Sequence, residues 1–126
     1  MAARILLVDD EEMVRETLMA FLEDEGLEVV AVDSGESAVQ AVESGQVFDV
    51  CVMDVRLPGM DGNEAIRALA RRAPRLRFLI HTGSMDYSLP ADLRRMGLSE
   101  ARIFNKPMLD LAEMARAVRD LASGAA

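Results

Sequence analysis

Five polar side chains stand directly after short apolar runs, at positions where buried strands would end. They are Asp9 and Asp10 after ILLV, Asp54 after FDVCVM, Thr82 after FLIH, and Lys106 after RIFN. Carboxylates in a cluster repel one another unless a cation lies among them, and a hard divalent ion such as Mg²⁺ prefers oxygen ligands. A carboxylate beside such an ion, with a lysine and a hydroxyl nearby, has the groups that phosphoryl transfer to an aspartate requires.

The apolar runs alternate with helical patterns along the chain. Strands are predicted at 5–8, 27–32, 48–53, 78–81 and 102–105. Helices are predicted through 14–22, from Ser34 or Gly35 to Gly45, through 66–73 before Pro74, from Pro90 over a short stretch, and through 111–122. Because nearly every strand position is apolar, the pattern predicts an α/β fold, a parallel sheet covered by helices on both faces.

This architecture predicts where the five polar side chains meet. Right-handed crossovers place the carboxyl ends of all parallel strands at one edge of the sheet, and ligands bind in the crevice at that edge. Asp54 is then displayed as a phosphoacceptor where its strand stops and the loop LPGMDG begins. In this hypothesis Thr82 donates a hydrogen bond to the phosphoryl oxygens and Lys106 pairs with their charge.

Four segments, LLVDDEE, VMDVRLPGMDG, IHTG and FNKP, resemble in sequence and order the receiver domain of bacterial two-component response regulators. The resemblance covers essentially the whole chain. It implies a single receiver domain over 1–126, with a core of about 3–122, and a flavodoxin-like, doubly wound five-stranded sheet of order 2-1-3-4-5. It also implies a phosphorelay partner upstream, a histidine kinase or a phosphotransfer protein, or a small phosphodonor that phosphorylates Asp54.

The resemblance further implies a role for each site residue. Asp10 and Asp54 would bind Mg²⁺ directly, together with the backbone carbonyl of Arg56, and Asp9 would act largely through water. Thr82 and Lys106 would engage the phosphoryl group. The bond between Lys106 and Pro107 is commonly cis in this family. The domain would be a signalling switch whose 82–106 surface changes, with no enzymatic activity beyond slow self-dephosphorylation.

Composition and charge restrict the classes of binding partner and the cellular compartment that we expect for this protein. A net charge of −8 argues against a nucleic-acid surface and against anionic membranes. The sequence has no apolar stretch of membrane-spanning length, and its single cysteine, Cys51, fits a reducing compartment. We therefore expect a cytoplasmic protein whose output comes from another protein or from a domain outside these residues. Its oligomeric state is left open.

One position departs from the family pattern. Receivers usually carry Tyr or Phe three residues before the lysine, and here that residue is Ile103. Phe104 is expected to point into the core, and Tyr87 is expected to be a surface loop residue, although it could substitute for the missing ring. An alternative function follows from this departure: a phosphorylation-independent interaction module on a receiver fold.

Arg56 and Ser84 flank the expected path of an attacking water. Arg56 either contacts and shields the phosphoryl group, or is an exposed arginine without such a contact. The same residue opposes a further alternative, an Asp-nucleophile phosphohydrolase of the haloacid dehalogenase type. Those enzymes need a second acid two residues after the nucleophile, where this chain has Arg56.

Taken singly, each site residue has an ordinary structural explanation. Asp9 and Asp10 could cap the first helix, and Asp54 could be a turn-forming residue. His81, before the threonine, is interpreted as a hydrogen-bonded core histidine that could face Cys51 on the neighbouring strand. The joint occurrence of these residues at one predicted sheet edge favours the functional interpretation.

Overall fold

The fold is a five-stranded parallel sheet of order β2-β1-β3-β4-β5, as the resemblance implied. The computed structural model describes residues 2–106 and 110–124. The strands are β1 (Arg4–Val8), β2 (Glu28–Val32), β3 (Val50–Met53), β4 (Arg77–Thr82) and β5 (Ile103–Asn105). The strand order reverses between β1 and β3. The carboxyl ends of these two strands therefore border the same crevice.

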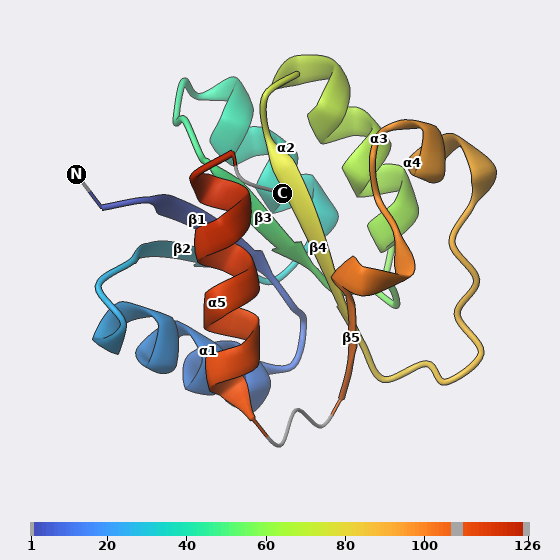
Figure 1. The fold of residues 1–126 in the computed structure, drawn as a ribbon. Coiled ribbons are helices and arrows are strands. Elements are labelled where there is room, and N and C mark those ends of the chain that lie inside the picture. The colour runs from blue at the N-terminus through green and yellow to red at the C-terminus, as the bar shows by residue number, and fades with distance from the viewer. Residues whose placement is uncertain (1, 107–109, 125–126) are drawn as a thin grey trace.

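Helices cover both faces of the sheet (Figure 1). Helices α1 (Glu12–Asp24) and α5 (Leu111–Ala122) pack on one face, and α2 (Gly35–Glu43), α3 (Gly62–Arg72) and α4 (Ala91–Arg95) lie on the other. A short 3-10 helix (Glu100–Arg102) precedes β5. No helix within the described ranges is long and apolar enough to cross a membrane.

Two hydrophobic cores form because side chains alternate along each strand. In β1, Ile5 and Leu7 face the α1 and α5 core, whereas Leu6 and Val8 face the α2 and α3 core. All four side chains are at most 1% exposed. This two-sided burial explains why the strand sequences are continuously apolar, as predicted.

The element boundaries follow local chemistry. Helix α3 begins with a capping box in which the Asp61 side chain accepts from the Glu64 backbone N–H and the Glu64 side chain accepts from that of Asp61. It ends at Arg72, because a residue that precedes a proline, here Ala73, is pushed out of the helical region. Strand β5 begins one residue later than predicted, since the Arg102 N–H is bonded to Ser99 in the 3-10 turn. Helix α4 is short and begins directly after Pro90, as expected.

Candidate functional site

The parallel ladders continue for one residue beyond the ends of β1, β3 and β5. The backbone N–H of Asp9 donates to the Val32 carbonyl (3.2 Å), that of Asp54 to Val8 (3.0 Å), and that of Lys106 to Thr82 (2.8 Å). These bonds fix the backbone from which each polar side chain projects. Three side chains from distant parts of the sequence are thereby placed at one sheet edge.

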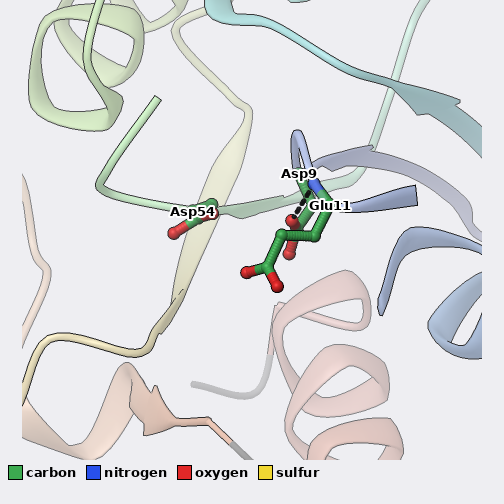
Figure 2. Close-up of side chains that lie close together, drawn as sticks. All are labelled: Asp9, Glu11 and Asp54. Carbon is green, nitrogen blue, oxygen red and sulfur yellow. Dashed lines mark hydrogen bonds between the residues drawn. The ribbon is translucent and has the colours of Figure 1, made fainter. Parts of the chain in front are cut away.

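Lys106 lies at the centre of a carboxylate cluster. Its Nζ is 2.9 Å from Asp9 Oδ2, 3.0 Å from Glu11 Oε1 and 3.1 Å from Asp54 Oδ2. Asp9 and Asp54 are buried, and the lysine side chain is only 12% exposed. Figure 2 shows the three carboxylates, with Asp54 from the end of β3 and the other two from the β1–α1 connection. The lysine offsets charges that burial would otherwise make costly.

The pKa values of this cluster reflect burial and mutual charge. Burial raises the pKa of the Asp54 carboxyl above its ordinary value, and the nearby charge of Asp9 adds to this, while Lys106 and the Arg56 backbone N–H oppose it. Burial disfavours the charged form of Lys106, but its bonds to Asp9 and Glu11 and the charge of Asp54 outweigh that effect and raise the lysine pKa. The ammonium therefore stays charged and favours the ionised form of Asp54.

The cluster has the composition of a site for a hard cation. One oxygen each from Asp9, Glu11 and Asp54 lies within 4.8 Å of the other two. Three carboxylate ligands at this spacing suit an oxygen-seeking divalent ion. Asp10 is exposed, and it lines a pocket of about 510 Å³ together with Glu11, Asp54, Arg56 and Lys106.

Thr82 ends β4 and is completely buried. Its Oγ1 accepts a hydrogen bond from the Ser84 backbone N–H at 3.0 Å. Because a hydroxyl can accept and donate at once, Thr82 retains its own proton for a second bond. The residues that follow it, Gly83 and Ser84, line the 510 Å³ pocket.

Arg56 reaches across the pocket from the β3–α3 loop to the β4–α4 loop. Its Nη2 donates to Ser84 Oγ (3.1 Å) and lies 3.7 Å from Asp86 Oδ1. The Ser84 hydroxyl donates to the same Asp86 carboxylate at 2.7 Å. Arg56 is thus an exposed residue with partners on the opposite wall, and this Arg56–Ser84–Asp86 network crosses one side of the pocket.

Gly62 determines how closely α3 approaches the acceptor. Its N–H donates to the Val55 carbonyl at 2.8 Å, and a Cβ added to it would lie 2.2 Å from the carbonyl oxygen of Asp54. The position therefore requires glycine because of a close backbone approach. The Pro-Gly loop ahead of it is held by Glu36, whose Oε2 accepts from the Met60 N–H at 3.0 Å.

The interpretation of His81 is wrong in two respects. Neither ring nitrogen has a hydrogen-bond partner among the described residues, although the side chain is 3% exposed. His81 also does not face Cys51: the cysteine belongs to the α2 and α3 core, whereas His81 lies two residues after Leu79, which faces α1 and α5. Burial, followed by the charge of Lys106, lowers the pKa of His81 to about 4, so the ring is neutral at pH 7.

Of the positions expected for the two aromatic side chains, that of Phe104 is confirmed and that of Tyr87 is wrong. Phe104 packs against the α1 and α5 core as expected, while Ile103 packs on the opposite face. Tyr87 is not a surface residue: it is half-buried against the α2 and α3 core, and its hydroxyl donates to Asn63 Oδ1 at 2.7 Å. Burial raises the pKa of this phenol. Pro107 lies outside the described residues, as does the predicted cis bond.

Glu11 is the site residue that the sequence interpretation missed. As part of an acidic run before a helix, it resembles a group that favours the helix dipole. In the structure Glu11 precedes α1 as its N-cap, and its backbone N–H donates to Asp9 Oδ1 at 2.9 Å. That turn directs the Glu11 carboxylate to Lys106, a residue that no local pattern could associate with it. The Asp9 side chain therefore accepts from the N-cap residue Glu11 and is not itself the cap of α1.

The fold and the site define a doubly wound α/β domain with an acidic cluster and a lysine at the carboxyl edge of its sheet. The family model of the response regulator receiver domain matches residues 5–119. The chain belongs to this receiver-domain family, whose members act in signalling.

Individual relatives are consistent with this assignment. The response regulator GacA of Pseudomonas viridiflava is 35% identical over 123 residues, which cover 96% of this chain and 56% of GacA. The response regulator FleR of Pseudomonas aeruginosa is 39% identical over 93 residues, covering 72% of this chain and 20% of FleR. The chain thus spans about half or less of these relatives. The response regulator TrrA of Thermotoga maritima, solved in complex with Mg²⁺-BeF, has a TM-score of 0.78 and 27% identity, with 94% of this chain and 98% of TrrA covered.

Proposed function

We propose that this receiver domain accepts a phosphoryl group on Asp54 with Mg²⁺ as its cofactor. The observation that carries the proposal is the ion-paired cluster: a buried carboxylate at a strand end, paired with Lys106 beside two further carboxylates. Asp54 Oδ2 is engaged by Lys106, which leaves Oδ1 to attack. A bond forms between that oxygen and phosphorus while the bond from phosphorus to the donor's leaving atom breaks.

Each residue then has a defined task. Lys106 favours the ionised form of Asp54 and pairs with the added phosphoryl charge, and the Thr82 hydroxyl donates to a phosphoryl oxygen. Asp10, Asp54 and the Arg56 carbonyl would hold Mg²⁺, with Asp9 acting largely through water. The acidic cluster adds Glu11 as a candidate ligand. The bound ion supplies positive charge that offsets the carboxylates and the transferred group.

The first test is intact mass after incubation with acetyl phosphate and Mg²⁺. The wild type is expected to gain one phosphoryl group and Asp54→Asn none, because the amide is not a nucleophile. Asp49→Asn is the matched control, since Asp49 precedes β3 at its other end and should leave the uptake unchanged. Equal labelling of wild type and Asp54→Asn would contradict the proposal.

A second prediction concerns the lifetime of the phosphorylated form. Removal of the Arg56–Ser84–Asp86 network in Arg56→Ala is expected to speed dephosphorylation by about fivefold, the rate equivalent of roughly 1 kcal/mol. The reason is freer access of water to Asp54 from the side of the pocket on which Arg56 lies. Phosphoprotein decay after removal of the donor measures the rate, with Arg116→Ala on α5 as control. Identical decay of all three proteins would show that Arg56 shields nothing.

The interaction module remains a second candidate because of Ile103. It predicts the same partner affinity with and without phosphorylation. For the proposed switch, the upstream partner is a histidine kinase or phosphotransfer protein, and the downstream partner an output protein or an output domain outside these residues. We propose that this takes place in the cytoplasm, within one receiver domain over 1–126, with self-dephosphorylation as its sole turnover.

A further inference from the structure

The segment after β4 is tied to α3 by two side-chain contacts on one helix face. Tyr87 donates its hydroxyl to Asn63 Oδ1 at 2.7 Å, and Arg67, one turn further along α3, donates to both oxygens of Asp92 at 2.6 and 3.1 Å. The Asp92 and Arg67 side chains are both roughly 40% exposed, so that ion pair contributes little. Tyr87 is half-buried against the core, and its hydrogen bond is the better protected contact.

Both ends of the Tyr87–Asn63 hydrogen bond lead back to the acceptor site. Asn63 directly follows Gly62, which packs on the Asp54 carbonyl. Tyr87 directly follows Asp86, which accepts from Ser84, and the Ser84 N–H donates to Thr82. The bond thus closes a ring of contacts that has Asp54 on one side and Thr82 on the other.

A phosphoryl group on Asp54 pulls on the Thr82 side of this ring. Three anionic oxygens on Asp54 attract the free proton of the Thr82 hydroxyl, and they compete with Ser84 and Asp86 for the guanidinium of Arg56. A shift of Thr82 and Ser84 toward Asp54 draws the chain at Asp86 and Tyr87 with it. Asn63 stays in place, because the capping box and the Gly62 backbone contacts hold the first turn of α3.

We infer that the Tyr87–Asn63 hydrogen bond couples the acceptor site to the 83–92 surface: it is made in the unphosphorylated protein and released on phosphorylation. This inference rests on the proposed phosphorylation of Asp54. Tyr87 is a positioning residue, and the chain thereby has a signalling ring that does not depend on an aromatic residue at Ile103. The free energy of this hydrogen bond stabilises the unphosphorylated arrangement relative to the phosphorylated one.

Tyrosine fluorescence reads this bond directly. Tyr87 is the sole tyrosine, and the sequence has no tryptophan. Titration of the wild type with beryllofluoride in the presence of Mg²⁺ is expected to change the fluorescence until it reaches a plateau at high beryllofluoride concentration. The free Asn63→Ala protein should already resemble the saturated wild type. If the mass increases with acetyl phosphate but the fluorescence stays constant, the coupling is wrong and the proposed function stands. If neither changes, both are wrong.

Affinity for the phosphoryl analogue gives the direction of the coupling. By linkage, Tyr87→Phe and Asn63→Ala should each bind Mg²⁺-beryllofluoride about two- to tenfold more tightly, the equivalent of one hydrogen bond. The double variant should bind no more tightly than either single variant, because both changes remove the same bond. Arg71→Ala, at an exposed position on α3, serves as the control and should not differ from wild type. Unchanged or weaker binding by the single variants, or additive effects in the double variant, would overturn the inference.

Discussion

Replacement of Lys106 by methionine is expected to lower the free energy of unfolding at pH 7 by about 3 to 5 kcal/mol without divalent ions, the usual cost of buried charges that lose their partner. Methionine keeps the apolar stem of the lysine and removes its ammonium. Asp9 and Asp54, at most 4% exposed, would then repel each other without a cation. Urea unfolding measures the change, with Arg116→Met on the exposed side of α5 as control.

The loss should shrink as the pH falls. Burial raises the pKa of Asp54, and the charge of Lys106 is one of the effects that oppose it, so the variant's Asp54 has a still higher pKa. A carboxyl with a raised folded-state pKa contributes stability below its unfolded pKa, and this contribution is lost as the pH rises through the folded value. Acid therefore stabilises Lys106→Met relative to wild type. A deficit independent of pH would contradict this account.

Mg²⁺ should replace part of the missing charge. At about 100 times its dissociation constant, an ion that binds only the folded state adds roughly 2.7 kcal/mol of stability. We expect this gain in Lys106→Met, where the three carboxylate oxygens remain within reach of one ion. The gain should be smaller in Asp54→Asn, which lacks one of the charged ligands. Equal gains in both variants would mean that the ion binds elsewhere.

Gly62→Ala is expected to destabilise the protein by about 3 kcal/mol, at the upper end of the range for overpacking. The new Cβ would lie 2.2 Å from the Asp54 carbonyl oxygen and 2.7 Å from Val55 Cα, and neither backbone atom can yield as a flexible side chain could. Because Asp54 must shift, phosphoryl uptake from acetyl phosphate should fall together with the stability. Thermal unfolding and intact mass on the same samples measure both effects.

Gly83→Ala provides the matched control for this substitution. Its added Cβ would meet Lys106 Cδ at 3.9 Å, an ordinary contact, and the position does not require a left-handed backbone. A change of no more than about 0.5 kcal/mol is expected. If Gly62→Ala were as well tolerated as Gly83→Ala, the close approach of α3 would not be what positions Asp54.

The sequence by itself determined the fold and most of the site. Continuous apolar strands with intervening helical patterns specify a parallel sheet covered on both faces, and this placed the polar side chains at the ends of β1, β3, β4 and β5 at one edge. Asp9, Asp54 and Lys106 do meet there. Such inferences succeed because strand ends can be recognised from the local sequence, and in a parallel sheet the carboxyl ends of all strands lie at the same edge.

Tertiary structure decided what depends on distance and packing. The turn at Asp9 directs Glu11 toward Lys106, 95 residues away, and the register of β4 turns His81 away from Cys51. Tyr87 lies against the α2 and α3 core because its ring finds apolar contacts there and its hydroxyl finds an acceptor in Asn63. Single side-chain contacts of this kind form where segments distant in the sequence meet, and no local sequence pattern relates those segments.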